Sequence, residues 1–208
     1  VELEEHRLTI GFARRFATYK RANLVFSDLE RLRAIGADRI QFVFSGKAHP
    51  KDEGGKQLIR DIFASAGEVA NEIPVAFIEN YDMDTGLAMT SGVDIWLNNP
   101  IRPLEASGTS GMKAAMNGVP NCSILDGWWP EGCEHGVNGW AIGGAEDERD
   151  DARDAENIYN VLEHEVLPRW DEGPERWAKL MRASIATSAR FTGARMIADY
   201  LHFYDRFA

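Results

Sequence analysis

The chain is poor in cysteine and has no long apolar run, and both absences exclude classes of protein. Its only cysteines, Cys122 and Cys133, lack CxxC spacing and have no histidine at the spacing of metal ligands. We therefore expect two free thiols in a reducing compartment and no metal site. No stretch of about 18 consecutive apolar residues occurs, so no segment is expected to cross a membrane.

Basic residues are in the minority, with 23 lysines and arginines against 33 aspartates and glutamates, and the net charge is -10. Such a chain repels nucleic acids and anionic membranes, so neither is expected as a partner. Residues 1–6 are acidic where a signal peptide would be basic and then apolar, which favours a cytoplasmic protein. Because residue 1 is not methionine, we also expect a fragment of a longer protein.

Apolar runs alternate with helical segments through the first two thirds of the sequence. Strands are predicted at residues 8–13, 40–45, 74–78, 93–97 and 121–125. Helices are predicted from the basic loop 14–21 to about residue 35, then from residue 52 or 54 to about 70, at 83–89 and at 112–117. Continuous apolar strands separated by helices are typical of a parallel sheet covered on both faces, so the predicted fold is a doubly wound, Rossmann-like α/β sheet.

The last third has a different character. Residues 146–154 form a dense run of charges, which predicts a solvated loop or the start of a helix. Helices are predicted at residues 157–167 and 175–189, with Pro168 and Pro174 between them. The aromatic residues of segment 191–207 are interpreted as core packing. We therefore predict one domain, with a core at residues 1–145 and a helical C-terminal extension at 146–208.

The most informative segment is 105–113, which reads Glu-Ala-Ser-Gly-Thr-Ser-Gly-Met-Lys. Its two glycines allow backbone amides to approach a ligand closely, and its hydroxyls add donors. The helix predicted to open here would contribute unpaired amides and the positive end of its dipole. Two interpretations remain open: an anion site in which Lys113 supplies a charge or a Schiff-base amine, and an ordinary strand-to-helix turn with a solvated lysine.

Three loops are predicted to follow strands at one edge of the sheet, at residues 14–21, 46–50 and 98–113. Ligands of doubly wound sheets bind at the carboxyl ends of the strands. The first loop contains Arg14, Arg15, Lys20 and Arg21 within eight residues. A basic loop alone is typical of a solvated surface, but its place after an apolar strand in an acidic chain favours an anion site.

Together these motifs resemble the C-terminal catalytic half of the α-glucan (glycogen or maltodextrin) phosphorylases, which have two facing Rossmann-like domains in the GT-B arrangement. Segment 105–113 matches the family's cofactor-lysine motif, Glu-Ala-Ser-Gly-Thr-x-x-Met-Lys, at every defined position. Segment 14–21 resembles the family's Lys-Arg-Ile-x-x-Tyr-Lys-Arg, with Arg14 in place of lysine. Shorter matches occur at residues 46–50, 79–81 and 125–127, and residues 128–132 resemble the shorter bacterial and archaeal members.

The resemblance implies the transfer of glucosyl units from an α-1,4-glucan to orthophosphate, which gives glucose-1-phosphate. It implies that Lys113 carries pyridoxal phosphate as a Schiff base and that the cofactor's phosphate exchanges a proton with the substrate phosphate. The catalytic group would comprise Lys113, Arg15, Lys20 and Glu105. The cofactor would be bound by Lys113, Lys20, Thr109, Ser110, Gly111 and Tyr81, and the substrates by Arg15, Glu105, Ser107 and Gly108.

Two alternatives to a phosphorylase remain. Many nucleotide-sugar glycosyltransferases of the GT-B arrangement carry Glu-x7-Glu here, whereas this chain has Glu105 followed by Lys113, as phosphorylases do. The Arg-x4-Lys spacing of Arg15 and Lys20 occurs in both groups. A nucleotide-sugar-dependent lobe and a non-catalytic carbohydrate-related module are the alternatives. Asp82 stands where the long phosphorylases have a basic residue, so one anchoring charge is missing or comes from elsewhere.

The resemblance also implies a partner, because the amino-terminal lobe of the family supplies acceptor contacts and part of the cofactor pocket. With 208 residues, this chain covers only one of the two lobes, so the cleft would have one wall. We therefore expect little or no phosphorylase activity from the isolated chain. A homo-oligomer is compatible with the resemblance.

Overall fold

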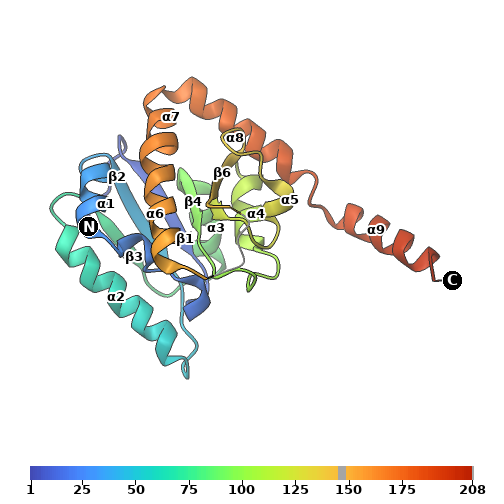
Figure 1. Ribbon diagram of the computed structural model, residues 1–208, viewed down its shortest axis with the longest axis horizontal. Coiled ribbons are helices and arrows are strands. Elements are labelled where there is room, and N and C mark those ends of the chain that lie inside the picture. The colour runs from blue at the N-terminus through green and yellow to red at the C-terminus, as the bar shows by residue number, and fades with distance from the viewer. Residues whose placement is uncertain (145–148, 208) are drawn as a thin grey trace.

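The computed structural model describes residues 1–144 and 149–207. Its centre is one six-stranded sheet in which every paired strand is parallel, in the order β3-β2-β1-β4-β5-β6. This arrangement confirms the predicted doubly wound, Rossmann-like fold (Figure 1). The strands are β1 (Leu8–Ala13), β2 (Ile40–Ser45), β3 (Val75–Ile78), β4 (Ile95–Asn98), β5 (Asn121–Ile124) and β6 (Gly139–Ile142).

Helices connect the strands and form the C-terminal third. Carboxylates cap four of them, because Asp28, Asp52, Asp82 and Asp150 each accept a backbone N–H of the first turn. The α-helices are α1 (Leu29–Gly36), α2 (Glu53–Val69), α3 (Met83–Gly92), α4 (Thr109–Met116), α5 (Trp129–Gly132), α6 (Asp151–Val161), α7 (Leu167–Asp171), α8 (Pro174–Ser188) and α9 (Gly193–Asp205). Two 3-10 turns, η1 (Thr18–Lys20) and η2 (Leu24–Phe26), and one π-helical turn, η3 (Leu162–Val166), complete the set.

The two faces of the sheet carry cores of different size. On one face, alternate side chains of β1, namely Leu8, Ile10 and Phe12, belong to the main core, to which α1, α2 and α6 contribute. On the other face a smaller cluster joins β2 and β4 to α3 and α4. Helix α8 packs against α7 and against α4, one of the helices that cover the sheet (Figure 1).

The strand order reverses between β1 and β4. Strand β1 pairs with β2 on one side and with β4 on the other, where Gly11 lies beside Trp96. The loops that leave this edge are tied together, since Phe16 bridges Ala48 and the N–H of Ile101 donates to the carbonyl of Tyr19 at 2.7 Å. The crevice at the carboxyl ends of β1 and β4 is where doubly wound sheets bind ligands.

The helix predicted from the basic loop to about residue 35 is confirmed at its end, because α1 ends at Gly36, but its predicted start was wrong. The chain instead makes η1 and η2, and α1 begins only at Leu29. Arg21 adopts a left-handed conformation with φ 48°, which interrupts a helix, and Asp28 caps α1 through the N–H of Arg31. Strand β6 and the short helix α5 were not predicted.

The prediction that Pro168 separates two helices was also wrong. Helical structure continues from α6 through η3 into α7, which contains Pro168 in its first turn. Proline lacks the N–H that an α-helical turn would use, and the wider π turn just before it accommodates this loss. Pro174 does begin a new helix, α8.

The aromatic residues of α9 do not pack in the core, so that interpretation was wrong. Helix α9 has no buried residue, and it projects away from the sheet in Figure 1. No described element covers it, because it lies beyond the layers that flank the sheet. Its exposed apolar side chains are Met196, Ile197, Tyr200, Leu201, Phe203 and Tyr204, followed by Phe207.

The predicted boundary between residues 145 and 146 lies outside the described residues, as does the first part of the charged run. The described part of that run contains Asp150, which caps α6, so a helix does start there. None of the described helices combines the length and the apolar character needed to cross a bilayer.

Candidate functional site

Arg14, the first residue after β1, crosses the switch point of the sheet. Its buried guanidinium donates to the side-chain oxygen of Asn98 and to the carbonyl of Leu97, at the end of β4. Asn98 in turn donates to Ser123 of β5 at 3.1 Å. Burial lowers the pKa of Arg14 to about 10, with the nearby Glu105 carboxylate opposing the shift. Arg14 therefore stays charged at neutral pH and joins the ends of three strands.

Lys20 and Glu105 form a buried ion pair beside Arg14. The Lys20 amine contacts Oε2 of Glu105, and each residue is only 8% exposed. The Arg14 guanidinium lies 3.8 Å from the same oxygen, and the Lys20 amine lies 4.6 Å from the centre of the Tyr19 ring. Two residues that the resemblance assigns to different ligands thus contact each other in the ligand-free chain.

A turn after β5 holds the loop 105–111 in place. One Asp126 oxygen accepts the N–H of Glu105 at 2.8 Å, and the other accepts the N–H of Gly127 at 2.9 Å. The N–H of Trp128 donates to the carbonyl of Ser107 at 2.9 Å. Asp126 therefore caps its own turn and also fixes the backbone of Glu105.

The loop opens α4 with free amides. Gly108 has φ 81°, a left-handed conformation that favours glycine, and it lets the chain turn sharply into the helix. The amides of Thr109 and Ser110 begin α4 and therefore have no intrahelical acceptor. Gly111 must lack a side chain, because a β-carbon there would lie 2.4 Å from the Asn121 side-chain oxygen.

Lys113 lies one helical turn after Thr109 and therefore shares a face of α4 with it. Its side chain is exposed and makes no ion pair with a described residue. Tyr81 is partly buried against the small core cluster that contains Ala114, the neighbour of Lys113. The structure thus brings Tyr81 to the same helix as the cofactor-binding lysine that the resemblance implies.

Asp82 performs a local structural task where the long phosphorylases carry a basic residue. Its side chain accepts the N–H of Thr85 and so caps α3. The pKa of this carboxyl is lowered, chiefly by that backbone hydrogen bond. A capping role explains why this position is acidic here.

Arg15 differs from its neighbours in the basic segment because its side chain is exposed and forms no ion pair with a described residue. Ser107 is exposed as well, on the same edge of the sheet. His49 and His135 are exposed, and His135 contacts Glu165 at 2.6 Å.

Sequence comparison decides the family. Residues 3–135 match the family described as Carbohydrate phosphorylase. The chain belongs to that family. It is 51% identical to the maltodextrin phosphorylase of Thermococcus litoralis over 99% of this chain and 26% of that protein. It is 49% identical to the glycogen phosphorylase of Aquifex aeolicus, over 98% of this chain and 31% of the relative, and 43% identical to that of Mycobacterium tuberculosis, over 95% and 24%.

This phosphorylase-family chain spans about a quarter to a third of the length of those relatives. The family match covers the three loops at the carboxyl edge of the sheet, whereas α6 to α9 lie beyond it. Family membership alone therefore does not show that this chain has the whole activity of a relative.

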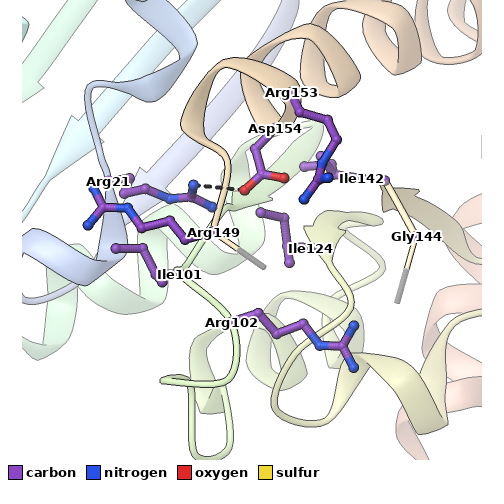
Figure 2. A pocket seen from close by; sticks show the side chains of 10 residues that line it. Arg21, Ile101, Arg102, Ile124, Ile142, Gly144, Arg149, Arg153 and Asp154 are labelled. Carbon is purple, nitrogen blue, oxygen red and sulfur yellow. Dashed lines mark ion pairs between the residues drawn. The ribbon is translucent and has the colours of Figure 1, made fainter. Parts of the chain in front are cut away.

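Arg21 belongs to the phosphorylase-like basic segment but not to the crevice. It is 4% exposed, and Nη1 lies 2.7 Å from Asp154 and 2.9 Å from Asp151 of α6. Its remaining donors bind the carbonyls of Asn99 and Pro100 at 3.0 and 2.8 Å. Figure 2 shows the Arg21–Asp154 pair inside a pocket at the ends of β5 and β6. Arg21 is a cross-link between the β4 loop and α6.

Trp128 and Trp129 are both buried, so neither lies on an association surface of this family member. The Trp129 indole donates to the carbonyl of Trp140 at 3.1 Å. The two tryptophans form an apolar cluster with Ala115 of α4.

Asn98 and Asp126 are site residues that sequence reasoning did not single out as functional, and Arg14 was named only as part of the basic loop. Arg14 had a signal, since it replaces a lysine of the phosphorylase motif. Asn98 and Asp126 had none, because their partners lie 84 and 21 residues away in the sequence.

Proposed function

We propose that this chain is the C-terminal lobe of an α-glucan phosphorylase of GT-B arrangement. The complete enzyme would transfer glucosyl units from an α-1,4-glucan to orthophosphate and release glucose-1-phosphate. One observation carries the proposal: the Arg14–Lys20–Glu105 group lies at the carboxyl ends of β1 and β4, and Glu105 begins the loop that opens α4, the helix of Lys113. Family membership supports it.

The residues present fit pyridoxal phosphate. The Lys113 amine is exposed and has no carboxylate partner among the described residues. It is therefore available to react with an aldehyde. The first amides of α4 have no intrahelical acceptor and suit phosphate oxygens, with the hydroxyls of Thr109 and Ser110 nearby. When bound, the cofactor would supply a phosphate group that exchanges a proton with the substrate phosphate. Lys113, Thr109, Ser110, Gly111 and Tyr81 would hold it.

Arg15 would bind the substrate phosphate, because its exposed guanidinium offers a bidentate fork that no carboxylate of the described residues occupies. The amide of Gly108 would donate to the same phosphate. Two phosphates held close together repel each other, so a cluster of cations and N–H groups is needed to keep both charged.

Lys20 and Glu105 would exchange partners when ligands enter. In the ligand-free chain they neutralise each other. A phosphate near Lys20 would attract the amine, and Glu105 and the amide of Ser107 would then be free to bind hydroxyls of the glucosyl unit. The ion pair thus keeps two ligand-binding groups satisfied and oriented until the substrates bind.

The amino-terminal lobe would complete the site as the partner of this chain. With one wall of the cleft, the chain alone is expected to release little or no glucose-1-phosphate from maltodextrin. The proposed function therefore needs a test in a two-lobed protein, and the chain length relative to its relatives points to the same design.

A chimera provides that test. Residues 1–208 would replace the matching segment of the Thermococcus litoralis maltodextrin phosphorylase, and glucose-1-phosphate release from maltodextrin and orthophosphate would be measured. We expect phosphorolysis from the chimera and none from its Lys113→Ala variant, with equal thermal stability of the two proteins.

Two results would contradict the proposal. One is a folded chimera that binds pyridoxal phosphate and releases no glucose-1-phosphate. The other is thermal stabilisation of residues 1–208 by ADP-glucose or UDP-glucose and none by pyridoxal phosphate, which would favour the nucleotide-sugar alternative.

A further inference from the structure

Trp128 lies directly against the backbone of the loop 105–111. Its N–H donates to the carbonyl of Ser107 at 2.9 Å. Its indole ring is so close to two glycines that a β-carbon on Gly108 would lie 3.2 Å from Cδ1, and one on Gly111 would lie 3.0 Å from Nε1. Because packed interiors resist such overlap, the ring limits where this backbone can lie.

Phe191 packs edge-on against the same indole from the connection between α8 and α9. The two ring centres are 4.9 Å apart and the ring planes meet at 86°, the edge-to-face geometry that aromatic pairs prefer. Met112 and Ala115 of α4 belong to the same apolar cluster as Phe191. Phe191 therefore supports both the ring beneath the loop and the helix that the loop opens.

Arginines fix Phe191 from outside. The guanidinium carbon of Arg195 lies 5.2 Å from the centre of the Phe191 ring, and that of Arg190 lies 5.9 Å away. Arg195 also binds the Glu131 carboxylate of α5 at 2.8 Å. The first turn of α9 is thus tied to α5, the short helix that begins next to Trp128.

We propose that Phe191 is a positioning residue of the loop 105–111. It fixes the Trp128 indole, and the indole holds residues 107–111 in the conformation that presents free amides. The identity of the ligand rests on the proposed function, whereas the coupling is a property of the ligand-free chain. The C-terminal segment that contains Phe191 would then set the geometry of the loop in the cofactor-lysine motif 105–113.

Amide hydrogen exchange of the ligand-free chain measures this coupling. The reporters are the amides of Gly111, Met112 and Trp128, which donate to Gly108 and Ser107. We expect Phe191→Ala to raise their exchange rates at least tenfold while the amides of strand β2 keep the wild-type rates. Phe191→Leu, which keeps apolar volume and loses the aromatic edge, should give a smaller rise at the same amides.

Phe63→Ala is the control, because Phe63 of α2 also makes one aromatic contact among the described residues, with Phe77 of the edge strand β3 at 5.2 Å. It should leave the three reporter amides unchanged. Wild-type exchange at these amides in Phe191→Ala would overturn the proposal. So would a uniform rise that includes β2, since it would show general destabilisation.

A second readout uses pyridoxal phosphate and borohydride, with labelling of Lys113 measured by mass spectrometry. The half-saturating concentration should rise at least fivefold in Phe191→Ala and stay unchanged in Phe63→Ala. Equal labelling of wild type and Phe191→Ala would contradict the positioning role. If wild type takes no label at Lys113, the proposed cofactor site fails in this chain, and hydrogen exchange alone decides the coupling.

Discussion

Two clusters of cationic side chains lie at the carboxyl edge of the sheet, and the same basic segment contributes to both. Between β1 and β4, Arg14 and Lys20 share the single carboxylate of Glu105, and Arg15 is exposed beside them. At the ends of β5 and β6, Arg21 binds two carboxylates of α6 and two carbonyls (Figure 2).

The difference shows which cations are available to a ligand. The crevice has more positive groups than carboxylates, so it can accept anions although the chain carries a net charge of -10. Arg21 has its charge and donors satisfied within the protein, and it can only stabilise the fold. The partners of each basic residue therefore have to be known before a basic motif is assigned to phosphate binding.

Removing Arg21 should have the largest effect on stability. Arg21→Ala leaves two carboxylates without their cation and two carbonyls without donors, and we expect a loss of about 2–4 kcal/mol in the free energy of unfolding. Urea unfolding followed by tryptophan fluorescence measures it. Arg169→Ala, which removes an exposed pair with Glu172, is the control and should cost less than about 1 kcal/mol. Equal losses would contradict the structural role of Arg21.

Arg14→Lys tests the cross-link between the strand ends. A lysine amine cannot replace the planar fork that reaches both Asn98 and the carbonyl of Leu97, so a buried acceptor is left unpaired. We expect a loss of about 1–3 kcal/mol in urea unfolding. Arg60→Lys, at an exposed position of α2, should change the free energy by less than about 0.5 kcal/mol. If the two variants unfold at the same urea concentration, Arg14 is not a cross-link.

Arg15→Ala should leave stability within about 0.5 kcal/mol and weaken anion binding instead. Calorimetric titration of the chain with orthophosphate, after loading with pyridoxal phosphate, should show about a tenfold weaker affinity, equivalent to about 1.4 kcal/mol. Arg176→Ala on α8, where the arginine is also exposed, is the matched control. Unchanged affinity in Arg15→Ala would remove Arg15 from the proposed phosphate site.

Asp151→Asn should have the smallest effect and depends on pH. Hydrogen bonds from Arg149 and then Arg21 lower the pKa of Asp151 below its usual value of 3.8. A lowered folded-state pKa gives stability that is present above 3.8 and is lost as the pH falls through the folded value. At pH 7 the free energy of unfolding of wild type should exceed that of Asp151→Asn by less than about 1 kcal/mol. In urea unfolding across pH the difference should shrink on acidification, and growth of the difference would contradict this sign.

The sequence predicts the sheet well because its strand signals are local. Residues 8–13 and 40–45 are apolar runs bounded by charged or turn-forming residues, and they form β1 and β2 over those same residues. Strand β6 lies at the edge of the sheet and is stabilised by its ladder with β5, a contact that no local sequence pattern indicates. The prediction that the aromatic residues of α9 pack in the core failed for a similar reason. The periodicity of α9 indicates an apolar face but not whether another element covers it.

The features of the site that depend on local sequence were likewise predictable, and those that depend on long-range pairing were not. The motif 105–113 predicts free amides and a lysine in the first turns of a helix, and α4 contains Lys113 but begins at Thr109, earlier than the predicted Met112. The pairing of Lys20 with Glu105 joins residues 85 apart, and that of Arg21 with Asp151 joins residues 130 apart. These distances in sequence explain why Arg21 could not be separated from Arg15 and Lys20 before the fold was known.

The most direct measurement is the mapping of pyridoxal phosphate on the purified chain. The protein would be incubated with the cofactor, reduced with borohydride, digested and analysed by mass spectrometry, alongside Lys113→Ala and the exposed-lysine control Lys179→Ala. A cation-rich crevice that holds the cofactor predicts pyridoxyl on Lys113 in wild type and Lys179→Ala, and no specific label in Lys113→Ala. Label spread evenly over surface lysines, with Lys113 no higher than Lys179, would contradict it.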